Sequence, residues 1–274
     1  MENDIKVTII GIPLDENSSY LRGAEQAPET IREALHCTSS NLCAENGVDL
    51  GNDRRWLDVG DLGIAEDPSI QPSMAQIENR IGELVGPATP VVALGGDHSI
   101  TWPIMRATAR AFPNLTILHL DAHPDLYDEL DGNRSSHACP FARIMEEGLA
   151  DRLVSVGIRT RNQHQREQAQ KFGVETICAG EDPREILKTL TPPLYLSLDL
   201  DVLDPAFAPG VSHHEPGGLT TREVLDILHA LPCPLIGADI VELNPDRDLN
   251  GMTAMVAAKL LKEIVAGILG EAGS

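Results

Sequence analysis

Short apolar runs rich in β-branched residues alternate with helical stretches along almost the whole chain of 274 residues. Eight such runs predict strands, at residues 6–12, 56–59, 91–94, 116–120, 153–157, 174–177, 194–198 and 235–239. Each run is apolar on both faces, which is typical of a parallel strand that helices cover on two sides. The alternation predicts a single α/β domain over residues 1–274, with three α/β/α layers and a mainly parallel sheet of about eight strands.

Helices are expected between these strands wherever apolar residues recur every three or four positions. The pattern predicts helices over residues 27–35, 73–85, 220–231 and 252–269. Thr220 is the expected N-cap of the third helix, with Glu223 as the acid of a capping box. Three connections, at residues 14–26, 124–139 and 204–218, are longer than usual, and long loops in a compact domain are commonly functional.

The charge balance excludes several classes of partner. Lys and Arg number 21 and Asp and Glu number 42, which gives a net charge of −21. Such a chain lacks the clustered cations that nucleic acids and anionic membranes require, so neither is an expected partner. Five cysteines without C-x-x-C spacing argue against disulfides and zinc knuckles. With neither a signal-peptide pattern nor a long apolar run, we expect a soluble cytoplasmic protein.

Four groups of polar residues directly follow predicted strands. They are GGDHS with His98, DAHPD from Asp121 to Asp125, Asp199-Leu200-Asp201, and Glu242 in VELNP. In open parallel sheets ligands bind beyond the carboxyl ends of the strands, which is where all four groups fall. Each has a plainer alternative when taken alone: a surface histidine, an acidic turn, a solvated strand end and a surface acid.

The second and third groups are the most informative. If the extended backbone continues, Asp121, His123 and Asp125 project from one face, and Asp199 and Asp201 do the same. Carboxylates gathered at the end of a buried strand repel one another unless a cation or a shared proton is present.

The candidate ligands are too numerous for one tetrahedral zinc site. They are four carboxylates and two imidazoles: His98, Asp121, His123, Asp125, Asp199 and Asp201. Bridging carboxylates can hold two metal ions. Oxygen-rich ligation with some imidazole suits Mn²⁺ better than an ion that prefers thiolates, and Ni²⁺, Co²⁺ and Fe²⁺ remain alternatives.

Together the four motifs resemble the ureohydrolase (arginase/agmatinase) family, and DLYDELDGNRSSHACPFARIMEEG and PGVSHHEPGGLTTREVLDILHAL look most like the plant-type arginases. The resemblance implies an arginase-like fold and two Mn²⁺ per subunit. It assigns His98 and Asp125 to one ion, His123 and Asp201 to the other, and Asp121 and Asp199 as bridges. A metal-bridging hydroxide would then attack the guanidinium carbon.

The resemblance also implies roles for other residues. His137 would be the proton shuttle, Asp125 would relay the proton of the nucleophile, and Glu242 would pair with the guanidinium. Asn133 and Ser136, in the loop after DAHPD, would contact the tail of the substrate. His213 and His214 are expected to be surface loop residues.

The resemblance favours L-arginine as substrate, cleaved to ornithine and urea, with agmatine or another alkylguanidine as the alternative. It also implies a homo-oligomer, a trimer or a hexamer. Three other readings compete: an amidohydrolase similar to histone deacetylases with a single zinc, a non-catalytic partner subunit with the same fold, and a metal-dependent binding protein without turnover. The first would not need His98 or Asp125, and the second would have lost ligands, whereas all six are present.

Overall fold

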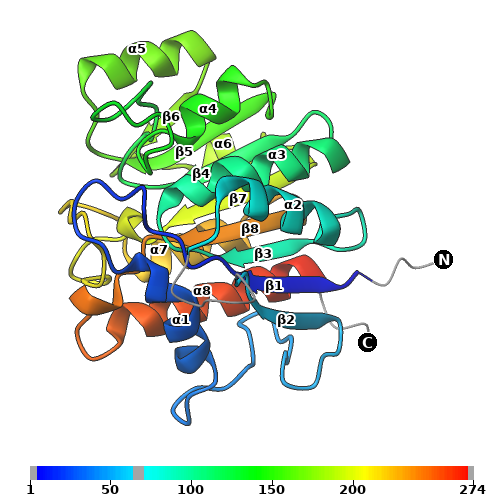
Figure 1. Cartoon of the computed structure of the whole chain (residues 1–274). Helices are drawn as coiled ribbons and strands as arrows, with labels where there is room; N and C mark the ends of the chain where they lie inside the picture. Colours follow the sequence, from blue (N-terminus) through cyan, green and yellow to red (C-terminus); the bar gives the residue numbers. More distant parts are fainter. Residues whose placement is uncertain (1–4, 64–70, 271–274) are drawn as a thin grey trace.

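The fold is built on one sheet of eight parallel strands. The computed structural model describes residues 5–63 and 71–270. The strands are β1 (Val7–Gly11), β2 (Trp56–Asp61), β3 (Val91–Leu94), β4 (Thr116–Leu120), β5 (Arg152–Ile158), β6 (Glu175–Cys178), β7 (Leu194–Asp199) and β8 (Leu235–Val241). Their order across the sheet is β2-β1-β3-β8-β7-β4-β5-β6 (Figure 1). The predicted α/β class is confirmed, while residues 1–4, 64–70 and 271–274 of the predicted domain lie outside the described residues.

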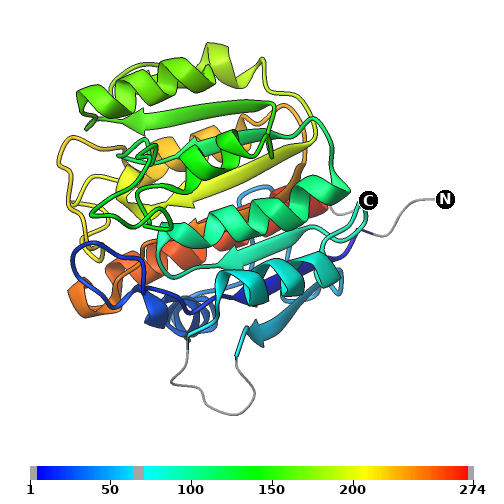
Figure 2. The same cartoon turned by 45° about the horizontal axis from the view of Figure 1, so that its top comes forward.

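Helices cover both faces of the sheet and complete three layers (Figures 1 and 2). They are α1 (Ala27–Leu35), α2 (Met74–Leu84), α3 (Thr101–Ala111), α4 (Pro140–Glu146), α5 (Gln163–Phe172), α6 (Arg184–Leu187), α7 (Thr221–His229) and α8 (Met252–Leu269). Helices α1, α6, α7 and α8 pack on one face, and α2 to α5 pack on the other. Among the described residues, none of these helices is long and apolar enough to cross a membrane, and all five cysteines are free.

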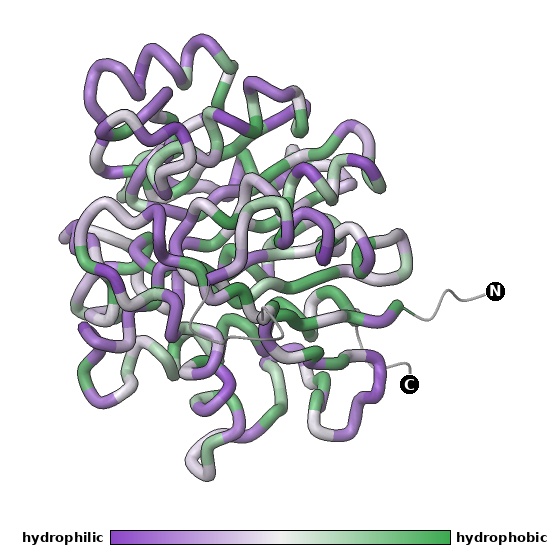
Figure 3. Tube along the Cα trace, in the orientation of Figure 1, coloured by the Kyte–Doolittle hydropathy of each residue, from purple (hydrophilic) through white to green (hydrophobic). Residues whose placement is uncertain are grey.

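The pleat of the strands divides the core into two apolar layers. In β3, Val92 and Leu94 join the layer under α8, whereas Val91 and Ala93 join the layer under α3. Successive side chains of a strand point to opposite faces, so an uninterrupted apolar run fills both layers at once. The hydropathy trace in Figure 3 shows apolar residues concentrated in the strands and in α8.

The two edge strands depart from the expected burial on both faces. Side chains of β2 are half-buried or exposed, and Leu57 is 63% exposed. All four residues of β6 are only half-buried. Each of these strands has a neighbour on one side only, so fewer side chains cover it. The prediction of two buried faces is therefore wrong for β2 and β6.

The predicted helices are confirmed to within two residues at each end. The capping box of α7 is present, because Thr220 Oγ1 accepts the Glu223 N–H at 3.1 Å and Glu223 Oε2 accepts the Thr220 N–H at 2.8 Å. Helices α3, α4, α5 and α6 were not predicted. The most polar of them, α5, is largely hydrophilic in Figure 3, so it carries only a weak apolar stripe.

The sheet order explains how distant motifs can meet. Strands β3, β8, β7 and β4 are direct neighbours at the centre of the sheet, although they span residues 91 to 241 in sequence. Because all four are parallel, their carboxyl ends lie along one edge. GGDHS, VELNP, the Asp199–Asp201 pair and DAHPD follow these four strands in that order.

Candidate active site

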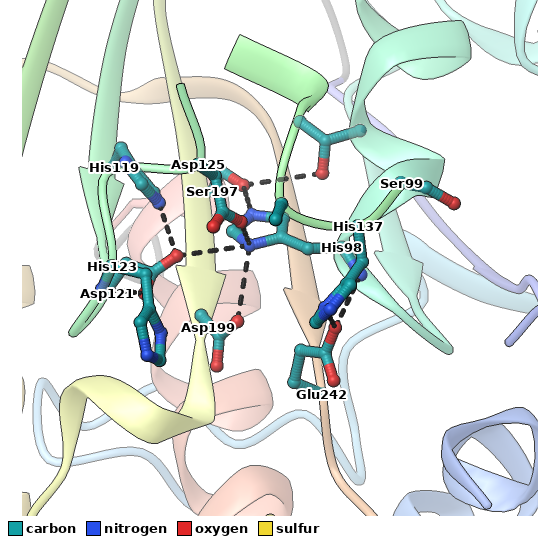
Figure 4. A network of polar contacts seen from close by, with 12 residues as sticks. His98, Ser99, His119, Asp121, His123, Asp125, His137, Ser197, Asp199 and Glu242 are labelled. Atoms are coloured by element: carbon teal, nitrogen blue, oxygen red, sulfur yellow. Dashed lines mark hydrogen bonds and ion pairs between the residues drawn. The ribbon is translucent and has the colours of Figure 1, made fainter. Parts of the chain in front are cut away.

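Side chains from all four motifs converge at the carboxyl ends of the central strands (Figure 4). His98 lies at the centre of this cluster, on a short 3₁₀ turn after β3. The cluster consists of the six candidate ligands and Glu242. All of these side chains are buried except that of His123, which is 24% exposed. The sheet order therefore gathers the predicted ligands, as the sequence led us to expect.

A recurring local turn holds these motifs. Asp97, Asp121 and Asp199 each accept the backbone N–H two residues further on, at 3.0, 2.5 and 2.8 Å. An aspartate that bonds its own backbone in this way ends a strand and starts a turn. The predicted continuation of the extended backbone is therefore wrong. Asp125 adopts a φ of 48°, so turns, not strand alternation, bring the carboxylates together.

One ring nitrogen of His98 is oriented toward carboxylates without bonding to any of them. Its Nε2 lies 2.9 Å from Ser197 Oγ, which in turn donates to Asp239 at 2.7 Å. Its Nδ1 lies 3.2, 3.0 and 3.2 Å from oxygens of Asp121, Asp125 and Asp199. This Nδ1 is nevertheless the one buried side-chain polar atom of the described residues without a hydrogen bond.

The arrangement at His98 fits a metal cation. Because Ser197 gives its proton to Asp239, the Nε2 atom of His98 carries the proton that bonds Ser197. In a neutral imidazole the Nδ1 atom then presents a lone pair to three carboxylate oxygens. One nitrogen lone pair and three carboxylate oxygens repel one another at these distances unless a cation binds between them.

His123 is the centre of a second, similar group. Its Nδ1 lies 2.8 Å from Asp201 Oδ2 and 3.4 Å from Asp121 Oδ1. Asp121 therefore offers one oxygen to His123 and its other oxygen, Oδ2, to His98. A carboxylate that divides its oxygens in this way suits two neighbouring cations. One ligand atom from each of Asp121, His123 and Asp201 lies within 4.8 Å of the others.

The charges of the cluster also require compensation. Burial, and then the charges of Asp201 and Asp121, raise the pKa of Asp199 well above its usual value. A carboxyl group in this position stays protonated unless a cation binds nearby. The donor set of carboxylates and imidazoles thus fits divalent ions that accept oxygen and nitrogen ligands.

His119 is a residue of this site that the sequence analysis missed. It lies fully buried inside β4, where Nε2 is 2.7 Å from Asp121 Oδ2 and Nδ1 is 3.2 Å from Ser155 Oγ. Phe141 packs on its ring with a centroid distance of 3.9 Å. These contacts fix the orientation of Asp121. A single histidine within the apolar run TILHL was the available signal.

His137 links two segments of the site. Its Nδ1 lies 2.9 Å from Glu242 Oε1, and its Nε2 lies 2.8 Å from Ser19 Oγ. Burial alone lowers the pKa of His137, but the charge and hydrogen bond of Glu242 outweigh it and raise the pKa to about 9. The ring is therefore protonated at neutral pH. Its backbone N–H donates to the carbonyl of Asn17 at 3.1 Å.

Glu242 keeps one oxygen free for a ligand. It follows β8 with a φ of 66°, which turns its side chain back over the sheet edge. Its Oε1 accepts the His98 N–H at 2.9 Å as well as the bond from His137. Among the described residues no group donates to Oε2. A carboxylate with a free oxygen is a suitable partner for a guanidinium.

The loop at residues 14–26 is tied to the first motif. Asp97 Oδ2 accepts the Asn17 N–H at 3.0 Å, and the Asp97 N–H donates to the Leu14 carbonyl at 2.7 Å. Gly96 makes this approach possible, because a Cβ at that position would lie 1.9 Å from the Leu14 carbonyl oxygen. Asp97 itself is buried, and it supports the loop that carries Ser19 to His137.

All three long loops contribute to one cavity of about 170 Å³ above the cluster. Its lining consists of Ser19, His123, Asp125, Tyr127, Leu130, His137, Ala138, Thr160, Gln165, Asp199, Asp201, His213 and Glu242. This lining contains neither Lys nor Arg. A larger cavity of about 520 Å³ between α7 and α8 has Glu263 as its buried acid, and that acid is already bonded to His229 and Lys259.

The expectation that His213 is a surface residue is wrong. Its ring lies in the cavity wall, with centroids 5.0 Å from His137 and 6.1 Å from His123. Burial lowers its pKa. The loop bends there because Ser212 Oγ donates to the Leu21 carbonyl at 2.8 Å and so draws residue 213 inward. His214 is exposed, as expected.

Two other predicted residues lie outside the cavity lining. Asn133 is exposed, and its Nδ2 donates to Asn17 Oδ1 at 3.2 Å. Ser136 is buried beneath the loop, where its Oγ accepts the Ala138 N–H at 3.4 Å. Their contacts with a substrate tail stay predictions.

Comparison with known proteins identifies the class. The profile of the arginase family matches residues 5–267, so the chain belongs to the arginase family and is a ureohydrolase. The mitochondrial arginase 1 of Arabidopsis thaliana is 49% identical over 95% of this chain and 80% of the relative. The solved arginase of Medicago truncatula superposes with a TM-score of 0.88 at 44% identity, over 97% of this chain and 88% of that one.

A more distant relative carries a different name. The agmatinase of Bacillus cereus is 33% identical over 96% of this chain and 91% of the relative. Arginases and agmatinases act on small guanidino compounds with a binuclear metal centre, and the predicted family and enzyme class are confirmed. The expected cytoplasmic location is contradicted, because several plant relatives are named mitochondrial arginases and point to an organelle.

Proposed function

We propose that this chain hydrolyses L-arginine to L-ornithine and urea, with two Mn²⁺ bound per subunit. One observation carries the proposal. Asp121 divides its oxygens between His98 and His123, beneath a cavity that Glu242 lines, and Oε2 of Glu242 has no donor among the described residues. The site thus combines a place for two cations with a place for a guanidinium. The names of the plant relatives support arginine as the substrate.

Six residues would hold the metal ions. In this proposal His98 and Asp125 bind one ion, His123 and Asp201 bind the other, and Asp121 and Asp199 lie between them. Two bound cations would supply a nucleophile near neutral pH by lowering the pKa of a shared water. Manganese is the preferred ion because oxygen ligands outnumber imidazoles.

Glu242 would bind and orient the substrate. Its Oε1 is held by His98 and His137, so the carboxylate cannot rotate freely and Oε2 keeps a fixed direction. A charge-assisted hydrogen bond from a guanidinium N–H to Oε2 places the guanidinium carbon over the metal-binding cluster.

Asp125 and His137 would move the protons of the reaction. Attack of water on the guanidinium carbon releases a proton, and the amine that leaves the carbon must gain one. Asp125 belongs to the cluster and lines the cavity, where its carboxylate can accept the first proton. His137, protonated at neutral pH, can deliver a proton from Nε2 to the leaving amine.

Agmatine is the second candidate substrate, and the composition of the cavity lining supports it. Agmatine lacks the carboxylate of arginine, and no Lys or Arg of the lining is available to pair with such a carboxylate. Selection of arginine then depends on neutral donors such as Ser19, Tyr127 and Thr160. The agmatinase relative gives the same alternative independent support.

A single assay tests the proposal. Mn²⁺-loaded protein is incubated in parallel with L-arginine, agmatine and 4-guanidinobutyrate, and urea is measured together with the amine product. We expect urea and ornithine from arginine. Putrescine as the preferred product would replace arginase by agmatinase, and absence of urea from all three compounds would reject the enzyme. The predicted trimer or hexamer stays a prediction.

A further inference from the structure

His213 lies in the cavity wall, where the proposed reaction assigns it no role. Its ring is flanked by His123 and His137 at centroid distances of 6.1 and 5.0 Å. Tyr20, which is 67% exposed, covers its outer side at 5.8 Å. The residue is thus placed at the entrance to the cluster, between a candidate metal ligand and the proposed proton donor.

The ring nitrogens of His213 have no hydrogen-bond partner in the part of the chain that the structure describes. Among the described residues no group forms a hydrogen bond to this side chain, whereas both nitrogens of the neighbouring His137 are bonded. One nitrogen of His213 lies within 4.8 Å of both a ring nitrogen of His137 and a carboxylate oxygen of Glu242. A polar atom in a cavity wall, close to the substrate-binding acid, is available to a ligand.

We propose that His213 is a substrate-binding residue whose ring nitrogen accepts a hydrogen bond from the guanidinium group held by Glu242. This inference rests on the proposed function. A guanidinium has only donors, arranged in a planar fork, so it needs several acceptors around its edge. Glu242 supplies one of them as an anion. His213 supplies a second from the adjacent wall, at a spacing that one planar cation can bridge.

The test compares His213→Ala and His213→Asn with His214→Ala. Asparagine keeps a hydrogen-bond acceptor in a shorter side chain. His214 is the neighbouring exposed histidine, and its ring bonds to the Pro209 carbonyl. The probe is methylguanidine, whose Kd for the Mn²⁺-loaded protein is measured by calorimetry. L-ornithine, which has no guanidinium, serves as the comparison ligand. Metal content and melting temperature are measured for each variant.

We expect His213→Ala to weaken methylguanidine binding about 10-fold, the size of one lost hydrogen bond to a charged group. The Kd of L-ornithine should change less than about 2-fold, and His213→Asn should recover part of the loss. His214→Ala should match the parent protein for both ligands. If His213→Ala does not fold, the His213→Asn protein gives the same comparison with a smaller expected loss.

Three results would overturn the inference: an unchanged methylguanidine Kd in the His213 variants, an equal loss for both ligands, or no binding to the parent. A third metal ion per subunit in the parent, lost in His213→Ala, would instead make His213 a ligand beside His137 and Glu242. The urea assay of the parent separates this inference from the proposed function. A parent without urea release whose methylguanidine binding depends on His213 would reject the function alone.

Discussion

Ser19 Oγ lies 2.8 Å from His137 Nε2, on the side of the ring opposite Glu242. The proposed proton donor is thus held between a loop after β1 and a turn after β8. For His137→Asn we expect kcat for urea release to fall by about 100-fold or more, because one general acid contributes that much. Metal content should stay at the parent value. Retention of more than half of the parent kcat would exclude His137 as the donor.

The pH profile gives a second test of the same histidine. Because Glu242 raises the pKa of His137 to about 9, the ring is protonated below that pH and loses its proton above it. We expect kcat of the parent to decline as the pH rises through this value. Ser19→Ala should shift the alkaline limb, and His137→Asn should remove it. An unchanged limb in His137→Asn would assign that ionisation to another group.

Asp121 and Asp125 should differ in the number of metal ions that they control. Asp121 faces both His98 and His123, whereas Asp125 approaches only His98. We expect Asp121→Ala to lose both ions and Asp125→Ala to lose one, as measured by elemental analysis after dialysis. Equal losses in the two variants would contradict the division of oxygens between two sites.

Removal of the metal should destabilise the protein at neutral pH. Chelation would leave four buried or nearly buried carboxylates facing one another, with the pKa of Asp199 raised by burial and by its neighbours. We expect a chelator to lower the melting temperature by about 5 °C or more, and added Mn²⁺ to restore it. A melting temperature independent of Mn²⁺ would argue against a metal bound to the folded state.

Glu263 should contribute to stability away from the active site. Burial raises its pKa, but hydrogen bonds from Lys259, His229 and the Glu45 N–H outweigh burial and lower the pKa below the usual 4.5. Because the folded pKa is lowered, this stability is complete above pH 4.5 and is lost as the pH falls through the folded value.

For Glu263→Gln we therefore expect a loss of about 1–3 kcal/mol in the free energy of unfolding at pH 7. The gap from the parent should shrink as the pH falls below 4.5. Denaturant unfolding at several pH values measures this difference in the free energy of unfolding. The control is Glu185→Gln, an 86% exposed acid paired with Lys188, which should stay within about 0.5 kcal/mol of the parent. A gap that does not depend on pH would contradict the assignment.

A pair of glycines tests the support of the 14–26 loop. Gly96→Ala would place a Cβ 1.9 Å from the Leu14 carbonyl oxygen, so the loop that carries Ser19 must shift, and both stability and kcat should fall. Gly82→Ala is the control, since α2 leaves space there with the nearest side chain at 4.0 Å. It should stabilise by about 0.5–1 kcal/mol. An unchanged kcat in Gly96→Ala would show that the position of this loop does not affect catalysis.

The sequence was sufficient for the strands and for the meeting of the six candidate ligands in one place, because both follow from local signals. An apolar run marks a strand, and DAHPD directly after such a run marks a site. It was insufficient for α5, whose polar surface hides the helical period, and for the exposed β2, whose place at the sheet edge depends on the strand order.

Other residues of the site could not be recognised because their contacts are long-range. His213 enters the cavity through a bond between Ser212 and Leu21, which are distant in sequence. Ser19 becomes relevant only when the loop after β1 meets His137. The convergence of Asp125 was predicted, but the reason was wrong, since a positive φ replaces the extended backbone.

The place of β8 in the sheet sets the order of events during synthesis. It is the last of the described strands to leave the ribosome, yet it lies between β3 and β7. The two parts of the sheet that contain β3 and β7 therefore cannot join until β8 is present. Glu242 follows that strand. A nascent chain therefore carries every metal-binding residue of the proposal before it has the strand that joins β3, and with it His98, to β7 and β4. Assembly of the complete centre around His98 therefore waits for β8, and uptake of both metal ions should report that β8 has joined the sheet.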